Sequence, residues 1–225
     1  MAQSGAVNGT VALSSQLVDR GLAITPATAI LQGTASWTLP SGWAFGVAAG
    51  TQVRQATPLA EVLAQASRTW RVAPDWQFVA ALAYEDYPGP ASSAFNHMEA
   101  SASWIYRDVL TLGVAAMTPT SGAAHPLLGA VDLDFRWPLP LHLSLAAGAG
   151  YARNQMPDYY TDTDEYGSHR YRDGTRVDSY GYGHLGLVWR QGPWRVEVDR
   201  VFVDATLRQD GLAASPWVAT AAWSF

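Results

Sequence analysis

The feature of this sequence that most limits its fold is an alternation of apolar with small or polar residues, with a period of two, that recurs along the whole chain. It is clearest in ILQGTASWTLPSGWAFGVAAG at 30–50, where Trp37 and Leu39 share one parity before the turn at 40–42, and Trp43 and Phe45 resume it afterwards. A period of two is that of a β-strand. Two such runs joined by so short a link predict a β-hairpin.

Four more segments repeat this design, at 60–87, 96–118, 127–152 and 179–204, with tight turns at 73–75, 107–108, 138–140 and 191–193. The opening run VNGTVALSSQL and the closing run WVATAAWSF add one strand each, so we predict twelve strands, an even number as in bacterial single-chain barrels. The links between hairpins, near 20–29, 54–60, 86–95, 118–127, 153–179 and 205–216, are longer than the turns.

Composition favours a membrane protein over a soluble β-sandwich, which could share the alternation. Charged residues are 15% of the chain, compared with roughly 25% in an average soluble domain, and no apolar run approaches the ~20 residues of a membrane helix. We therefore predict an all-β fold, a single 12-stranded antiparallel transmembrane β-barrel over residues 1–225 in the bacterial outer membrane. Short turns and both termini would be periplasmic, and the longer loops extracellular.

Aromatic residues gather beside the tight turns and at the chain end, as in the aromatic girdle of a membrane barrel. The predicted girdle comprises Trp37, Trp43, Trp70, Trp76, Trp104, Tyr106, Trp137, Trp189, Trp194, Trp223 and Phe225. Trp217, Tyr84 and Tyr151 would lie at the opposite rim.

Residues of the other parity would face the lumen, and many of them are ionisable. The predicted lumen set is Arg20, Gln32, Arg54, Gln65, Arg71, Glu85, His97, Glu99, Arg107, Asp132, Asp134, Arg136, His142, His184, Arg190, Arg195, Glu197 and Asp199. Such charges either pair into a network that fills the barrel or line a wet passage.

Twelve strands about 4.8 Å apart and tilted by about 40° close to a backbone diameter of roughly 24 Å, which leaves on the order of 10 Å after side chains. Small residues of the inward parity, at Gly46 to Gly50, Gly113 to Ala115 and Ser144 to Gly150, either leave a gap or receive large side chains. We predict a narrow, porin-like channel for ions or small polar solutes. The alternatives are a non-conducting structural or partner-binding barrel and, third, a lipid-modifying enzyme.

Two sets of acidic residues suggest cation sites. Asp132 and Asp134 on one strand face could form part of a cation-selective ring or a metal site, or they could pair with arginines across the lumen such as Arg107, Arg190 or Arg195. The segment 153–179 holds Asp158, Asp162, Asp164 and Glu165, which could bind calcium, although the spacing is not that of an EF-hand and a solvated extracellular loop is the simpler interpretation. Its tyrosines could also contact a partner. We predict no metal and no cofactor.

Features of other protein classes are lacking. The net charge is −5, which does not favour nucleic acid, and cysteine is absent, which excludes a disulfide framework. No Ser, His and acid set converges on the outer wall, where a barrel lipase would meet its substrate, and His142 beside Ser144 points inward. We predict no enzyme activity, and as partners outer-membrane lipid, lipopolysaccharide, the barrel-assembly machinery and a small polar solute.

The first 50 residues resemble a family of proteobacterial proteins of unknown function, the Gcw_chp type. The matching features are Arg20-Gly21 after the entry strand, Gln32-Gly33 at the start of the next strand, and Ser41-Gly42 before the aromatic Trp43. The resemblance implies an outer-membrane barrel without an assigned activity.

Overall fold

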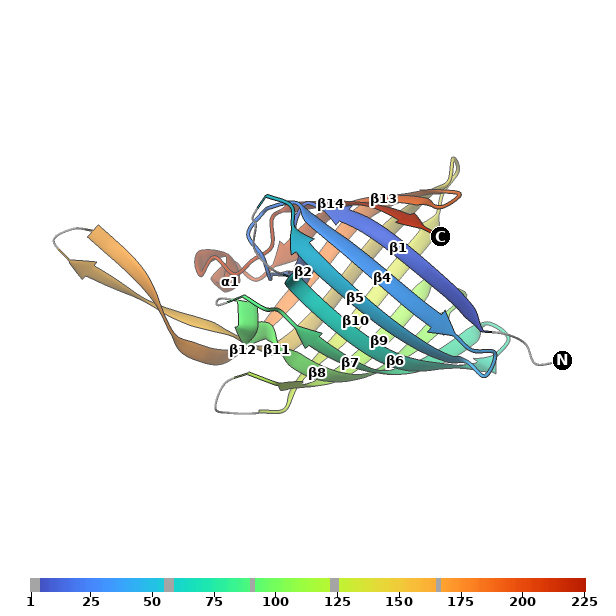
Figure 1. Ribbon diagram of the computed structural model, residues 1–225, viewed down its shortest axis with the longest axis horizontal. Coiled ribbons are helices and arrows are strands. Elements are labelled where there is room, and N and C mark those ends of the chain that lie inside the picture. The colour runs from blue at the N-terminus through green and yellow to red at the C-terminus, as the bar shows by residue number, and fades with distance from the viewer. Residues whose placement is uncertain (1–4, 55–58, 90–91, 122–125, 165–166) are drawn as a thin grey trace.

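Twelve of the strands form one closed antiparallel barrel (Figure 1). The computed structural model describes residues 5–54, 59–89, 92–121, 126–164 and 167–225, with the side chains of 159–173 outside this description. The barrel strands are β1 (Ala6–Ser14), β4 (Ile30–Thr38), β5 (Trp43–Gln52), β6 (Leu59–Ala73), β7 (Trp76–Asp86), β8 (His97–Tyr106), β9 (Leu110–Pro119), β10 (Leu128–Pro138), β11 (Leu143–Asp164), β12 (Gly167–Gln191), β13 (Trp194–Val203) and β14 (Trp217–Ser224). The predicted fold class is confirmed.

Every barrel strand pairs with its neighbours in the chain except at one seam, where β1 pairs with β14 in the register Thr10 with Ser224 to Ser14 with Thr220. Two backbone hydrogen bonds of 2.8 and 2.9 Å between Gly9 and Phe225 extend this ladder. A Cβ on Gly9 would lie 2.5 Å from the ring of Phe225, so the absence of a side chain at residue 9 makes room for that ring. The seam lets the ladder close without a free edge.

The outer face carries the apolar parity that the sequence predicts. Its exposed side chains include Val47, Leu82, Val131 and Leu187, and the exposed aromatic residues Trp37, Trp104, Trp137, Trp194 and Trp223 stand beside the tight turns or the end of β14. The start of β1 and the end of β14 also lie at this end of the barrel, which is called the turn end below (Figure 1). An apolar wall ringed by tryptophan is the surface that a barrel presents to lipid.

At the opposite end, called the loop end, the link between β1 and β4 folds into the barrel and forms a small hairpin of β2 (Val18–Asp19) and β3 (Leu22–Ala23). Leu17, Leu22 and Ile24 of this inner hairpin belong to one buried apolar cluster with lumen-facing wall residues. These wall residues are Met117, Leu128, Ala130, Ala152, Met156 and Tyr180. The sequence had predicted a plain loop at 20–29. The segment turns inward instead because its apolar side chains are removed from water there.

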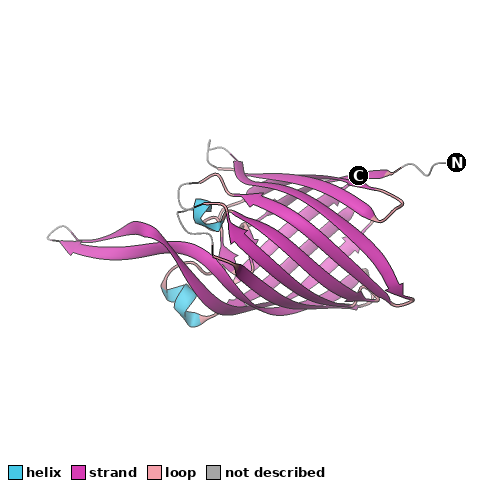
Figure 2. Ribbon diagram, turned by 90° about the horizontal axis from the view of Figure 1, so that it is seen from below, coloured by secondary structure: helices cyan, strands magenta, loops and turns pink. Residues whose placement is uncertain are grey.

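Two short helices complete the packing at the loop end: the 3₁₀ turn η1 (Ser92–Phe95) and α1 (Ala205–Gln209), which bury Phe95 and Leu207 in the same cluster (Figure 2). None of the helices in the described ranges is long and apolar enough to cross a membrane.

The predicted loop at 153–179 is also different in the structure. β11 pairs with β10 only as far as Arg153, and β12 pairs with β13 only from Tyr182 onward, yet β11 and β12 pair with each other up to Asp164 and Gly167. The two strands therefore leave the barrel as a two-stranded ribbon (Figures 1 and 2). The backbone pairing of β11 and β12 continues into the segment that we expected to be irregular, although the apolar alternation of the barrel strands does not.

Candidate functional site: the barrel lumen

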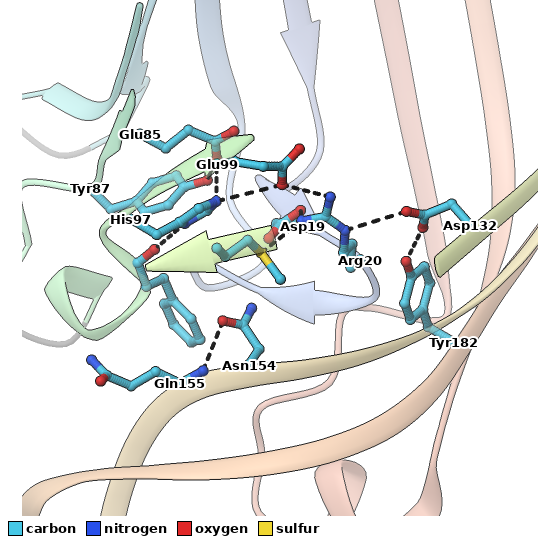
Figure 3. Close-up of polar contacts among 12 residues, drawn as sticks. Asp19, Arg20, Glu85, Tyr87, His97, Glu99, Asp132, Asn154, Gln155 and Tyr182 are labelled. Carbon is cyan, nitrogen blue, oxygen red and sulfur yellow. Dashed lines mark hydrogen bonds and ion pairs between the residues drawn. The ribbon is translucent and has the colours of Figure 1, made fainter. Parts of the chain in front are cut away.

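Arg20 lies at the tip of the inner hairpin and is the centre of the polar contacts inside the barrel (Figure 3). Its guanidinium donates a 2.7 Å hydrogen bond to Glu99 on β8 and lies 3.8 Å from a carboxylate oxygen of Asp132 on β10. Asp19 of the hairpin itself is 3.9 Å away. One arginine therefore bridges the hairpin to two strands of the barrel wall.

The backbone at the hairpin tip is suited to this close approach. Arg20 and Gly21 both have positive φ, 44° and 80°, and a Cβ on Gly21 would lie 3.1 Å from the Cβ of Tyr182 on β12. Glycine is the residue that adopts this conformation without strain and lets backbone approach a wall closely. The Arg20-Gly21 pair thus turns the chain and brings the guanidinium against the acids.

A second group of polar side chains surrounds the hairpin on its β7 and β8 side. Tyr87 donates a 2.6 Å hydrogen bond to Glu85, and the Nδ1 of His97 is 2.8 Å from the carbonyl oxygen of Phe95. The Nε2 of His97 lies 3.9 Å from carboxylate oxygens of both Glu85 and Glu99 and has no hydrogen-bond partner among the described residues. His97 is buried, and its Nε2 is equally close to the two carboxylates in the loop-end half of the lumen.

Asp132 and one further acid of the wall, Glu61, have neutral partners. Tyr182 donates a hydrogen bond to Asp132, and Gln32 on β4 donates one of 2.7 Å to Glu61 on β6. Around the hairpin tip, carboxylates therefore outnumber guanidinium groups.

The turn-end half of the lumen is different because its inward-facing polar side chains are open to solvent. Gln65, Thr34 and Thr69 face inward there and are exposed. Arg195 is paired with Glu197 on its own strand. A cavity of about 300 Å³ is lined by Asp134, Arg136, His184 and Glu197 together with residues of β9, β11 and the 107–109 turn. Asp199 and Arg190 face the same space on neighbouring strands.

The small residues of the inward parity receive large side chains from adjacent strands. A Cβ on Gly148 would lie 2.4 Å from the His184 ring and 2.5 Å from an oxygen of Asp134, and one on Gly150 would lie 2.4 Å from the Tyr182 ring. On β12, Gly186 meets Asp199 in the same way. Glycine lets these polar side chains lie flat against the wall instead of projecting toward the barrel axis.

The ion pairs in the described part of the lumen form separate groups. The group at the hairpin tip joins Arg20 to Asp19, Glu99 and Asp132, whereas Arg195 and Glu197 pair by themselves near the turn end. A barrel filled by one continuous network of charges is therefore not what the structure has.

Two predicted lumen residues do not face the lumen. Arg107 is one of three residues in the β8–β9 turn, where it and Asp108 have positive φ, and its side chain extends outside the barrel to form a 2.9 Å ion pair with Asp75 of the β6–β7 turn. Arg54 lies in an exposed turn after the end of β5. In both cases the parity was extended beyond the last residue of a strand, where it no longer determines which way a side chain points.

The other predicted lumen residues are on the inner face, with the exception of His142, which lies beyond a strand end like Arg54 and Arg107. On the strands these are Gln32, Gln65, Arg71, Glu85, His97, Glu99, Asp132, Asp134, Arg136, His184, Arg190, Arg195, Glu197 and Asp199. Arg20 reaches the lumen from the inner hairpin instead. His142 lies in the β10–β11 turn with a φ of 63°. Of the predicted arginine partners of Asp132, the structure shows none in contact, because Arg20 takes that place.

The acidic segment beyond the barrel is partly described. Asp158 is 3.5 Å from Arg176, which also lies 2.8 Å from Asp178 and pairs with Asp210. These contacts tie the base of the ribbon to the loop after α1. The side chains of Asp162 and Asp164 and the whole of Glu165 lie outside the described residues. Within the described ranges, no group of three or more His, Asp and Glu side chains could hold a metal ion.

Sequence reasoning did not identify Asp19, Glu61, Tyr87 and Tyr182 as lumen residues. The available signal was the apolar content of 15–29, since Leu17, Leu22 and Ile24 in a supposed surface loop call for burial elsewhere.

No protein-family model matches this chain, and no curated protein matches its sequence. Solved structures do match its fold. It is similar to the KdgM porin, with a TM-score of 0.58 at 7% identity over 97% of this chain and 98% of that one. It is also similar to the NanC porin, with a TM-score of 0.55 at 9% identity over 97% and 98% of the two chains. At such low identity the likeness shows a shared barrel fold.

Proposed function

We propose that this protein is an outer-membrane channel for ions or small polar solutes, and that the inner hairpin narrows the passage. The observation that carries the proposal is the polarity of the lumen. An open, charged half of the lumen at the turn end leads to a hairpin whose tip is held by the ion pairs of Arg20 and by backbone hydrogen bonds to residues 212–214, and not by strand pairing with the barrel wall. The fold that this chain shares with two barrels named as porins also supports the proposal of a channel.

Side chains that lie flat on glycine support a passage along the axis. His184, Asp134, Tyr182 and Asp199 all rest over glycines of neighbouring strands, which removes their bulk from the centre of the barrel. In a lumen on the order of 10 Å wide, the difference between a side chain along the wall and one across the axis decides whether a solute fits.

A non-conducting barrel is the second candidate, and one observation favours it. The inner hairpin, η1 and the segment after α1 together bury an apolar cluster inside the loop end. If this packing does not open, the lumen is closed at the loop end and solutes cannot pass through the barrel.

Conductance in planar bilayers separates the two candidates. We expect refolded wild-type protein to give small unitary currents in KCl, and Arg20→Gln to give larger or longer openings because the hairpin loses its attachment to Glu99 and Asp132. Arg208→Gln, which changes an exposed arginine of α1, is the matched control and should behave as wild type. Absence of current from the wild type and from Arg20→Gln alike would favour the closed barrel.

The orientation and partners belong to the same proposal. Tight turns and the aromatic-rich turn end would face the periplasm, and the ribbon would project from the cell. Lipopolysaccharide would then meet Arg200, whose guanidinium lies 5.4 Å from the ring of Trp217 on the outer face of the loop end. The barrel-assembly machinery would insert the chain into the membrane. The family that we propose for it is the Gcw_chp type.

The proposal includes no catalytic role and no cofactor. None of the hydrogen bonds between described residues joins a serine hydroxyl to a histidine ring, which is the contact that a serine hydrolase of the outer membrane would need. A lipid hydrolysis assay with the refolded protein tests this part directly.

A further inference from the structure

A trough of about 600 Å³ runs over the outer face of the wall from β4 to β8, and almost all of its surface is apolar. Its floor is β6, where Ala64 and Ala66 stand between large side chains of both neighbouring strands. Ala66 pairs with Phe45 and Leu82, and Ala64 pairs with Val47 and Tyr84. Two rows of large apolar side chains therefore form the sides of the trough, and the methyl groups of the alanines form its floor.

The trough ends at a positive charge. Arg68 is the next outward-facing residue of β6 toward the turn end, and it pairs across the sheet with Trp43. Its guanidinium lies 5.5 Å from the ring of Trp43 and 5.0 Å from the ring of Trp70. Its Nε has no hydrogen-bond partner among the described residues.

The position of Arg68 along the wall places its charge at the depth of the lipid headgroups. Trp43 and Trp70 belong to the aromatic belt, and such a belt marks the lipid headgroup region of a membrane barrel. The floor of the trough lies further into the wall, on the side of the hydrocarbon. From Arg68 to Ala64 the strand runs for about 13 Å at ~3.3 Å per residue, which at a tilt of about 40° is a depth of about 10 Å. That is a large part of one leaflet of a ~30 Å hydrocarbon core.

We propose that this trough is a binding site for a glycerophospholipid of the leaflet at the turn end. Its phosphate pairs with Arg68 between the two indole rings, and one acyl chain lies over Ala66 and Ala64. Arginine suits this role because its planar guanidinium donates two parallel hydrogen bonds to phosphate oxygens. The apolar walls match an acyl chain in both chemistry and width, and the charge stands where the headgroup must be.

The site goes beyond the channel proposal and does not depend on it, because every residue named faces away from the lumen. It does depend on the barrel being in a bilayer. A phospholipid retained by a barrel that carries no current would support the site and count against the channel, so the two proposals fail separately.

Native mass spectrometry of barrels refolded into phosphatidylethanolamine and phosphatidylglycerol bilayers, then extracted in mild detergent, tests the proposal. We expect wild type to retain a phospholipid. Ala66→Phe fills the trough, and Arg68→Gln removes the charge. Each should lower the fraction of barrels that retain phospholipid about tenfold, because the loss of one charge-assisted contact, or of a similar amount of apolar burial, weakens binding by about that factor.

Matched controls are available in the same wall. Ala221→Phe enlarges an outward-facing alanine of β14, and Arg153→Gln removes an outward-facing arginine of β11 near the loop end; both should retain lipid as wild type does. Heat-modified gel migration verifies that each variant has folded, and Ala64→Leu replaces Ala66→Phe if that variant does not fold. Equal retention by wild type and by folded trough variants would overturn the proposal. Retention of added lipopolysaccharide in place of phospholipid would do so as well.

Discussion

Replacing Arg20 with Gln should release the inner hairpin from the barrel wall. The side chain makes a charge-assisted hydrogen bond of 2.7 Å to Glu99 and lies 3.8 Å from Asp132, with 16% of its side chain exposed. A hydrogen bond to a charged group contributes about 1.5–3 kcal/mol net, and the second ion pair is largely offset by desolvation. We therefore expect the free energy of hairpin opening to fall by about 2–3 kcal/mol, which is about 30- to 150-fold in the opening equilibrium.

Amide hydrogen exchange measures this opening directly. The backbone N–H of Ala23 donates to the carbonyl of Leu212 at 2.8 Å, and that of Ala214 donates to the carbonyl of Gly21 at 2.8 Å, so both amides lose their partner when the hairpin leaves its place. Their protection should fall by the stated factor in Arg20→Gln, while amides of the β11–β12 pairing stay protected. Unchanged exchange of the Ala23 and Ala214 amides would refute the view that Arg20 holds the hairpin.

Three other outcomes follow from the geometry. Gly148→Ala places a Cβ 2.4 Å from the His184 ring, so we expect that ring to move toward the axis and unitary conductance in planar bilayers to fall; unchanged conductance would show that the ring is not beside the passage. The hydrogen bond and the charge of Arg107 lower the pKa of Asp75, so this exposed pair should stabilise the turns above the ordinary Asp pKa of about 3.9 and cease to do so as the pH falls through the lowered value. An Asp75→Asn variant should show a flatter acid branch in thermal unfolding, and an identical branch would contradict this. Cysteine at the outward-facing Val196 should react with a lipophilic thiol reagent in liposomes and poorly with a water-soluble one, whereas equal aqueous labelling would mean that this face is not in lipid.

The barrel itself could be predicted from the sequence because its strands obey one simple rule. Alternation with a period of two determines which side chains face outward, and a short turn between two alternating runs determines where a hairpin reverses. Trp37 and Phe45, which pair across the turn between β4 and β5, are an example. This rule depends only on local geometry, so no knowledge of distant contacts was needed.

The interior could be predicted only in part, because its decisive contacts join residues far apart in the chain. Parity placed Glu99 and Asp132 on the inner wall, but nothing local indicates that a hairpin would bring Arg20 between them. The same rule gave wrong positions for Arg54 and Arg107, which lie beyond strand ends where the backbone has turned. It also missed the ribbon, because the polar residues of 154–178 carry no apolar alternation that would mark them as strands.

The seam between β1 and β14 has a consequence for how the barrel is made. All other strand pairings of the barrel join neighbours in the chain, so they close short loops and can form early. The seam joins Thr10 to Ser224, and its ladder cannot form until both ends of the chain have met. We therefore expect closure to be the last pairing to form, and until Gly9 and Phe225 meet, the sheet would have two unpaired edges that could pair with other chains.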